Sequence, residues 1–108
     1  MEIRTGTPSE IENFPLYCED NDGDEILVAA GDGKIVGYVQ FSSDILYFIE
    51  SEKKGTGTAL IETLKANNWH LTAHNVEPTA KGFYEKMGFE VTGGNGWGGQ
   101  FNMEWWED

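Results

Sequence analysis

The sequence predicts an α+β fold in which a mixed, mostly antiparallel and twisted sheet carries helices on its faces. Three observations favour this architecture. Strand-like apolar runs fill the first half of the chain, the hydrophobic period becomes helical from residue 57, and strand-like runs return near the C-terminus. Glycine accounts for 14 of the 108 residues, twice the usual share of about 7%, and it separates these runs at expected turns.

Length, composition and charge narrow the class of protein. The chain has 108 residues, 39% of them hydrophobic, which suits one packed domain over residues 1–108. The net charge of −12 disfavours nucleic acid and anionic membranes as partners, because both bind basic surfaces. The same charge would attract a cationic partner, or it serves solubility alone. The sequence has neither a membrane-spanning run nor a signal-peptide pattern at its start, so we expect a cytoplasmic protein.

The N-terminal segment is predicted to form a short strand, a short helix and an acidic loop. The strand covers residues 2–6. Ser9 is expected to cap a helix that Pro8 and Pro15 keep short. The acidic segment 19–25 follows as a solvated loop, since its spacing fails the calcium-binding EF-hand pattern.

Two strands joined by a tight hairpin come next. The runs 26–30 and 34–41 flank Gly31-Asp32-Gly33, and Asp-Gly supplies the positive φ angles that a primed turn needs. Alternation predicts one set of apolar side chains on each face of the second strand, with Ile35, Val39 and Phe41 opposite Val36 and Tyr38.

A central strand is followed by a helix and another strand. The continuous apolar run 45–49 is typical of a strand covered on both faces. Over residues 57–68 the apolar side chains form one helical stripe, and three polar ones are expected to point outward, Glu62, Lys65 and Asn67. The next strand is predicted over residues 69–75.

The C-terminal third is predicted to hold a second helix and a final pair of strands. Pro78 suits the first turn of the helix. Gly88 is expected to end it in the left-handed conformation, with Phe89 folded back on Phe83 or Tyr84. The two strands then follow over residues 89–92 and 100–106, joined by the glycine-rich loop 93–99.

The strongest local feature is the segment 50–60, where a strand meets glycines that open a helix. The N–H groups in the first turn of a helix have no internal partner and carry partial positive charge, so glycines there let an anion approach. Lys53 and Lys54 add positive charge. The spacing fits neither the Walker A motif nor the dinucleotide fingerprint, because Leu60 stands at the third glycine position of the latter. The segment therefore indicates either a phosphate cradle or an ordinary strand-to-helix turn.

A second segment, residues 80–89, offers a catalytic side chain. Helix termination explains its last two residues, and Phe83 and Met87 are spaced as core neighbours four positions apart. Tyr84 is left without such an explanation. A tyrosine beside a cleft can donate a proton to a leaving group of high pKa.

In this order and separation, the two segments resemble the motifs of the GNAT superfamily of acyl-CoA-dependent N-acetyltransferases. The pyrophosphate loop of that family has the pattern Arg/Gln-x-x-Gly-x-Gly/Ala at the start of a helix, and residues 52–57 here are Glu-Lys-Lys-Gly-Thr-Gly. A later helix of the family carries Ala-x-x-Phe-Tyr-x-Lys-x-Gly-Phe, which residues 80–89 match at each defined position. The resemblance extends from Ile26 to the C-terminus.

The resemblance implies acetyl-CoA as the acyl donor and a primary amine as the acceptor. It places Tyr84 near the thioester sulfur as the proton donor to the leaving thiolate, and it uses a backbone N–H of the 47–49 strand to polarise the thioester oxygen. The contacts that it implies for the co-substrate come from the central strand, the helix start and two later positions: Tyr47, Phe48, Ile49, Lys54, Gly55, Thr56, Gly57, Thr58, Ala59, Asn75 and Phe83.

Three features depart from the family pattern. Glu52 replaces the usual Arg or Gln beside the expected pyrophosphate. The Asn or Ser that the family has before its second helix falls at Glu77 by strict spacing, and Asn75 takes that place only if the loop is longer. The N-terminal region is short, so we expect an acceptor site that is open, or completed by the loop 93–99, the acidic segment or a second subunit of a homodimer.

The sequence therefore predicts an acetyl-CoA-dependent N-acetyltransferase in which a cationic amine loses a proton and attacks the thioester directly. A lysine-type amine with a pKa near 10.4 needs a base. Glu50, at the end of the central strand, is the candidate, and an exposed strand-end carboxylate is the competing interpretation. The alternative function is a non-catalytic GNAT-like module that binds CoA or a protein partner, or a purely structural interaction protein.

The remaining candidates carry less chemistry. His70 and His74 share a strand face, but at 3.3 Å per residue their Cα atoms lie about 13 Å apart, so they cannot bind one metal ion together. A surface or packing role is favoured for His74 over a proton relay. Cys18, the only cysteine, cannot form an internal disulfide, and its acidic neighbours disfavour the thiolate. No metal site is predicted.

Overall fold

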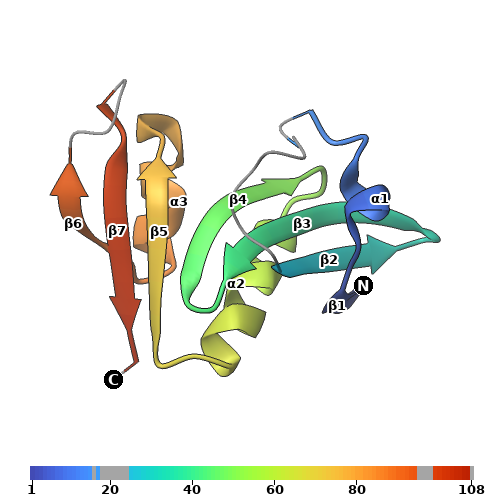
Figure 1. Cartoon of the computed structure of the whole chain (residues 1–108), viewed down its shortest axis with the longest axis horizontal. Helices are drawn as coiled ribbons and strands as arrows, with labels where there is room; N and C mark the ends of the chain where they lie inside the picture. The colour runs from blue at the N-terminus through green and yellow to red at the C-terminus, as the bar shows by residue number, and fades with distance from the viewer. Residues whose placement is uncertain (16, 18–24, 95–98, 108) are drawn as a thin grey trace.

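The computed structural model describes residues 1–15, 17, 25–94 and 99–107 (Figure 1). In chain order its elements are β1 (Glu2–Thr5), α1 (Pro8–Ile11), β2 (Glu25–Gly31), β3 (Lys34–Ser42), β4 (Ile45–Ser51), α2 (Thr56–Ala66), β5 (His70–Val76), the 3₁₀ helix η1 (Pro78–Ala80), α3 (Lys81–Lys86), β6 (Glu90–Gly94) and β7 (Phe101–Trp106). The strands of these ranges form one sheet in the order β1-β2-β3-β4-β5-β7-β6. Neighbours are antiparallel except for the parallel pair β4 and β5. The predicted α+β fold with a mixed, mostly antiparallel sheet is confirmed.

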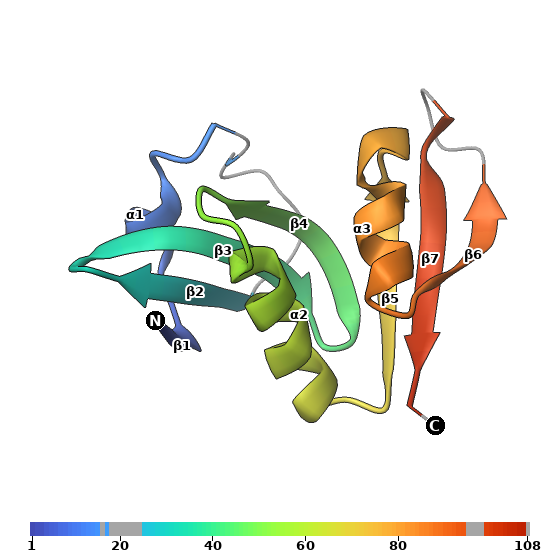
Figure 2. The ribbon, with the colours of Figure 1, turned by 180° about the vertical axis from the view of Figure 1, so that it is seen from behind.

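The helices lie on both faces of the sheet. Figure 2 shows α2 and α3 on one face, and α1 lies on the other face over β3 (Figure 1). The face of β5, β7 and β6 opposite α3 carries no helix of the described ranges (Figure 1). Within those ranges, no helix has the length and apolar character needed to cross a membrane.

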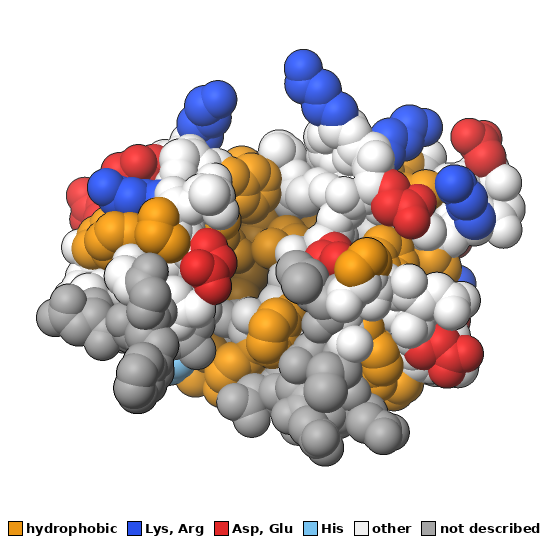
Figure 3. Space-filling view, turned by 90° about the horizontal axis from the view of Figure 1, so that it is seen from above, with side chains coloured by type: hydrophobic (Ala, Val, Ile, Leu, Met, Phe, Trp, Pro, Cys, Tyr) orange, Lys and Arg blue, Asp and Glu red, His pale blue; other side chains and the backbone are white. Residues whose placement is uncertain are grey.

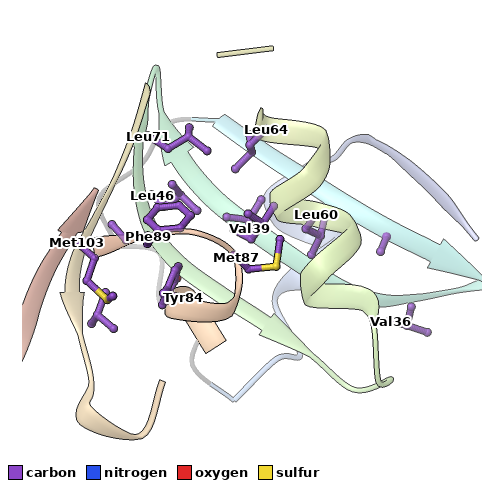
Figure 4. Close-up of a cluster of buried hydrophobic side chains, with 14 residues drawn as sticks. Val36, Val39, Leu46, Leu60, Leu64, Leu71, Tyr84, Met87, Phe89 and Met103 are labelled. Atoms are coloured by element: carbon purple, nitrogen blue, oxygen red, sulfur yellow. The ribbon is translucent and has the colours of Figure 1, made fainter. Parts of the chain in front are cut away.

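Two clusters of buried side chains hold the layers together. The larger cluster lies between the sheet and the helices α2 and α3, and Leu60, Ile61 and Leu64 of α2 belong to it (Figure 4). The smaller cluster lies under α1 and comprises Ile11, Phe14, Ile26, Val28 and Tyr38. Burial of these apolar surfaces is the dominant stabilising term of the fold.

A β-bulge in β3 overturns part of the predicted alternation. The register with β2 shifts by one residue between Ala29 and Ala30, which leaves Val36 as the extra residue of β3. Val36 therefore packs in the larger cluster, while Ile35 packs against the smaller one. The predicted faces are wrong for these two neighbours. They are right for the residues after the bulge, where Val39 and Phe41 pack on the larger cluster and Tyr38 in the smaller.

The first helix begins two residues earlier than predicted. Thr7, not Ser9, is its N-cap residue, and Ser9 lies inside the helix. The Thr7 N–H donates to the Glu10 carboxylate at 3.0 Å, and the Glu10 N–H donates to the Thr7 carbonyl oxygen at 3.0 Å. Threonine at the N-cap followed by glutamate three residues later is the capping-box pattern.

The predicted hairpin turn and helix stop are both present. Asp32 and Gly33 have φ angles of 53° and 81°, as a primed turn requires. Gly88 has a φ of 92°, and the Phe89 N–H donates to the Tyr84 carbonyl oxygen at 3.0 Å. The rings of Phe89 and Tyr84 meet edge to face with centroids 5.3 Å apart, which completes the Schellman stop.

Lys65 of α2 does not point outward as predicted. Its Nζ donates to the Met87 carbonyl oxygen at the end of α3 and lies 5.1 Å from the centre of the Trp105 ring. A lysine can bury its aliphatic stem in this way while its ammonium group finds polar partners. Lys65 thereby links α2 to the stop of α3, and Glu62 remains exposed.

Candidate active site

The start of α2 leaves backbone N–H groups free to bind an anion. Gly55 is the N-cap with a φ of 87°, and no side chain caps the first turn. The first i to i−4 hydrogen bond of the helix runs from the Ala59 N–H to the Gly55 carbonyl oxygen at 3.1 Å. The N–H groups of Gly57 and Thr58 therefore have no partner inside the helix. This is the geometry of the predicted phosphate cradle.

Close packing against β3 holds this helix start in place. Thr56 is buried, and a Cβ atom on Gly37 of β3 would lie only 2.7 Å from Thr56 Cγ2. The same Cβ would lie 3.0 Å from the carbonyl oxygen of Glu50. Glycine is thus required at position 37 for α2 to approach the sheet. Gly37 was not predicted from the sequence as a site residue, although a glycine inside a strand is a known sign of close backbone approach.

A small cavity of about 130 Å³ adjoins the helix start. Ile49, Glu50 and Ser51 of β4 line it together with Gly57 and Phe83. A Cβ on Gly57 would lie 3.3 Å from Phe83 Cζ, so this glycine keeps the space between α2 and α3 open. The structure therefore brings together three of the predicted co-substrate contacts, Ile49, Gly57 and Phe83.

The other predicted contacts at the helix start differ in exposure. Lys54, Gly55 and Thr58 are exposed, Ala59 is half-buried, and Thr56 is enclosed against the sheet. Glu52, which departs from the family pattern, places its carboxylate 3.7 Å from Lys34 Nζ of the β2–β3 hairpin.

A larger cavity of about 480 Å³ lies between β4 and β5. β4 supplies Tyr47, Phe48 and Ile49 to its lining, so these three predicted contact residues lie around one cavity. β5 supplies His74 and Val76, and the polar side chains of Glu77, Thr79 and Gln100 lie around it as well. Figure 3 shows hydrophobic side chains gathered in a hollow between the two halves of the surface.

Two irregularities in the sheet create this cavity. β4 and β5 pair at only two positions, Ile45 with Thr72 and Leu46 with Ala73, and then diverge (Figure 1). A register shift between β3 and β4 makes Tyr47 an extra residue, and the register between β5 and β7 shifts after Ala73. Beyond Leu46, β4 therefore forms no sheet pairs with β5.

Tyr84 of α3 reaches this cavity from the side of the helices. It is 6% exposed, and its ring contacts Phe83 and Phe89 edge to face, each with centroids 5.3 Å apart. Burial raises the pKa of Tyr84 to about 12. The hydroxyl is therefore protonated at neutral pH, which is the state that a proton donor needs.

Glu50 faces the α1 side of the sheet and not the large cavity. It pairs across the sheet with Tyr38, whose hydroxyl donates to Glu50 Oε2 at 2.7 Å. Burial and this carboxylate hold the pKa of Tyr38 well above its usual value. Of the two cavities, Glu50 lines only the small one, so its role as a base stays a prediction.

The two histidines of the chain lie in different surroundings. His74 lines the large cavity, with its ring centroid 5.9 Å from that of Tyr47. His70 is held by two carboxylates, since Nδ1 lies 2.9 Å from Asp44 Oδ2 and Nε2 lies 2.6 Å from Glu104 Oε2. In the described ranges no group of three His, Cys, Asp or Glu side chains could hold a metal ion.

Several residues singled out in the sequence lie outside the described part of the structure. These are Cys18, residues 19–24 of the acidic segment and residues 95–98 of the glycine-rich loop. Asn75 belongs to β5, and its side chain is also outside the described part. Of the loop 93–99, the first two residues belong to β6.

The comparison of the sequence with protein families gives one match. Residues 22–91 match the family model of the acetyltransferase (GNAT) domain. This range includes β2 to α3, and therefore both cavities except for Gln100. No curated protein sequence matches the chain significantly.

Solved structures with the same fold are numerous. A GCN5-related N-acetyltransferase of Rhodopseudomonas palustris superposes with a TM-score of 0.70 at 17% identity, covering 97% of this chain and 94% of its own. Escherichia coli ElaA gives a TM-score of 0.62 at 18% identity and covers 96% of this chain and 98% of its own. The PaiA N-acetyltransferase of Thermoplasma acidophilum, solved in complex with coenzyme A, gives 0.58 at 21% identity, covering 75% of this chain and 59% of its own.

Proposed function

Because the chain belongs to the GNAT acetyltransferase family, we propose that it transfers an acetyl group from acetyl-CoA to a primary amine. The observation that carries this proposal is the joint placement of two features. Gly57 at the uncapped start of α2 lines the small cavity, and Ile49 of β4 lines both this cavity and the large one, which Tyr84 also lines. A phosphate group and a reacting thioester would therefore lie along one continuous strand, β4.

The residues at the helix start fit the pyrophosphate of acetyl-CoA. The N–H groups of Gly57 and Thr58 would donate to phosphate oxygens, and the helix dipole favours the negative charge. Gly57 leaves room for such a group, since a Cβ there would contact Phe83 at 3.3 Å. The coenzyme A complex of the Thermoplasma acidophilum relative supports the same class of ligand. The pantetheine arm would follow the edge of β4 that is free of pairing with β5.

The chemistry needs no covalent intermediate on the protein. The lone pair of the neutral amine attacks the thioester carbon, the C–N bond forms and the C–S bond breaks. A backbone N–H of the Tyr47–Ile49 segment would donate to the thioester oxygen, where negative charge develops. Tyr84, protonated at neutral pH, would give its proton to the departing sulfur.

The acceptor is proposed to be a cationic amine. The net charge of −12 gives the protein a field that attracts cations, and steering of this kind raises association rates. Among the described residues that line the large cavity there is no lysine or arginine, and Glu77 contributes a carboxylate.

Binding is tested first, by thermal unfolding with and without acetyl-CoA. At a ligand concentration 100 times Kd, the expected stabilisation is about 2.7 kcal/mol. For a domain of this size that corresponds to a rise in Tm of about 10–20 °C. Release of the free thiol is then measured with a panel of amines. A Tm that does not move at millimolar acetyl-CoA would overturn the proposal.

One observation favours a second candidate function, a module that binds CoA or a protein partner without turnover. Glu52 stands where the family has arginine or glutamine, and its carboxylate is 57% exposed beside the proposed phosphate site. A carboxylate there weakens the binding of a polyanion unless Lys34 holds it aside, and weak binding of acetyl-CoA disfavours turnover. The two functions are separated by thiol release: a module would release no thiol with any amine, whether its partner is CoA or a protein.

A further inference from the structure

We propose that His74 accepts the proton that the acceptor amine must lose before it attacks the thioester. This inference rests on the proposed function of the same site and names a catalytic residue for it. The sequence favoured a surface or packing role for His74 and named Glu50 as the base. The two cavities separate these side chains, because His74 lines the large one and Glu50 lines the small one.

His74 and Tyr84 reach the large cavity from opposite faces of the sheet. Ala73, the residue before it, is buried in the cluster under α2 and α3. Ala73 and Val76 both belong to that cluster although they are three positions apart, because the register shift with β7 lies between them, and His74, the residue directly after Ala73, stands on the opposite face, which carries no helix. Tyr84 reaches the cavity from α3, on the other face. An amine entering from the open face would therefore meet His74 before it reaches the thioester beside Tyr84.

The other titratable side chains around this cavity are less suited to the step. They are Tyr47 of β4, Glu77 before η1 and Tyr84 of α3. Glu77 is exposed, and its Oε1 accepts a hydrogen bond from Gln100 Nε2 at 2.6 Å. Tyr84 is needed in its protonated form. Histidine is the side chain that exchanges protons near neutral pH, so it can take a proton from an ammonium group and return it to water.

The contacts of Glu50 and His74 support the same assignment. Glu50 Oε2 accepts the Tyr38 hydroxyl at 2.7 Å, beside the cluster under α1. The ring of His74 lies edge to face with that of Tyr47, the bulge residue of β4. The bulge and the divergence of β5 set the width of the cavity, so His74 lies where β4 is open to a substrate.

Protons and electrons balance in the proposed sequence. His74 takes one proton from the ammonium form of the acceptor, directly or through one water, and passes it to solvent. The freed lone pair forms the C–N bond, and the electrons of the C–S bond go to sulfur. The sulfur takes the proton of Tyr84, and the second proton lost by the nitrogen restores the tyrosine. The products are the N-acetyl amide, the free thiol of CoA and one proton.

The first test uses NMR and needs no turnover. The chain has only two histidines, so a spectrum of the His74→Gln variant assigns both ring signals. Spermidine is added to the protein saturated with CoA, a pair that cannot react. We expect the His74 ring signal to move, while the signal of His70 stays in place. An unmoved His74 signal, with spermidine bound by calorimetry, would overturn the proposal.

The second test compares pH–rate profiles of thiol release for the wild type, His74→Gln and Glu50→Gln. With spermidine, we expect His74→Gln to lower kcat/KM by about 10²–10⁴-fold. We also expect it to abolish the acidic limb of the profile. With trifluoroethylamine, which is neutral at neutral pH, the loss should be much smaller, because no proton has to be removed. A role in packing would lower both rates alike.

The possible results separate this inference from the proposed function. If the acidic limb persists in His74→Gln and disappears in Glu50→Gln, the carboxylate is the base and the inference is wrong. If acetyl-CoA binds to the wild type and no amine releases thiol, the chain is a binding module and the inference fails with the enzyme. If acetyl-CoA does not bind at all, the proposed function itself is overturned.

Discussion

The substitution Gly57→Val tests the helix start as the site of the phosphates. A Cβ at this position would already lie 3.3 Å from Phe83 Cζ and 3.8 Å from Ser51 Oγ. The two methyl groups of valine extend beyond that Cβ into a cavity of about 130 Å³. They would cover the N–H groups that the proposed pyrophosphate needs. We expect the rise in Tm with acetyl-CoA to disappear.

The stability cost of Gly57→Val can be separated from the loss of binding. Displacing the Phe83 ring should cost about 1–3 kcal/mol, as for other overpacked sites. Two variants provide the controls. Gly82→Val places the same side chain in α3 where no atom lies within 4 Å, so binding should be unaffected. Gly57→Ala adds only the Cβ, and alanine favours a helix over glycine by about 1 kcal/mol.

Isothermal calorimetry with acetyl-CoA is the assay, at a temperature where urea titrations show each variant to be folded. We expect binding by the wild type and Gly82→Val, weaker binding by Gly57→Ala and none by Gly57→Val. If Gly57→Val binds acetyl-CoA with the affinity of the wild type, the phosphates do not lie at the start of α2.

Three further changes have expected outcomes. Tyr84→Phe should keep acetyl-CoA binding and lower turnover by about 10²–10⁴-fold, measured as thiol release, and an unchanged rate would make Tyr84 only a core aromatic. Gly37→Ala should lower the free energy of unfolding by about 1–3 kcal/mol in urea, because its Cβ would lie 2.7 Å from Thr56 Cγ2, and an unchanged midpoint would contradict this packing. Hydrogen bonds to Glu104 and Asp44 raise the pKa of His70 in the folded protein. The stabilisation of the fold by protonated His70 is therefore complete below the pKa that His70 has in the unfolded chain, and it is lost as pH rises through the pKa in the folded protein. The difference in the free energy of unfolding between the wild type and His70→Gln, measured in urea titrations, should therefore shrink as pH rises above neutral. A difference that stays constant with pH would refute this.

Local patterns in the sequence predicted most elements and the backbone geometry at the start of α2 well. The Asp32-Gly33 turn, the stop at Gly88 and the opening of α2 depend on residues that are neighbours in the chain. Their φ angles and free N–H groups follow from residue type, so no knowledge of the tertiary fold was needed. The cap of α1 was misplaced by two residues, because Thr7 and Ser9 are both good N-cap residues and each has a glutamate three positions later, Glu10 and Glu12, so the capping-box pattern does not separate them.

The faces of the strands were harder to predict, since they depend on the register between strands. Alternation in β3 predicted opposite faces for Ile35 and Val36, which is correct, but assigned each to the wrong face. The reason is the extra residue, Val36, and a bulge is determined by the partner strand as much as by its own sequence. Lys65 was likewise placed outward, because a helical stripe does not reveal the Met87 carbonyl oxygen on another helix.

The same physical reason limits prediction of the acceptor side. The continuous apolar run 45–49 has no alternation that would reveal a bulge, yet the extra residue Tyr47 puts Leu46 and Ile49 on the larger cluster and Phe48 on the smaller. Glu50 is thereby paired with Tyr38, and His74 becomes the basic side chain of the large cavity. If β4 instead paired regularly with β3 through Tyr47, Phe48 and Glu50 would turn to the face of the larger cluster. Which side chains of β4 face the proposed acceptor site is therefore determined by one extra residue in β4, which acts through register and not through its own chemistry.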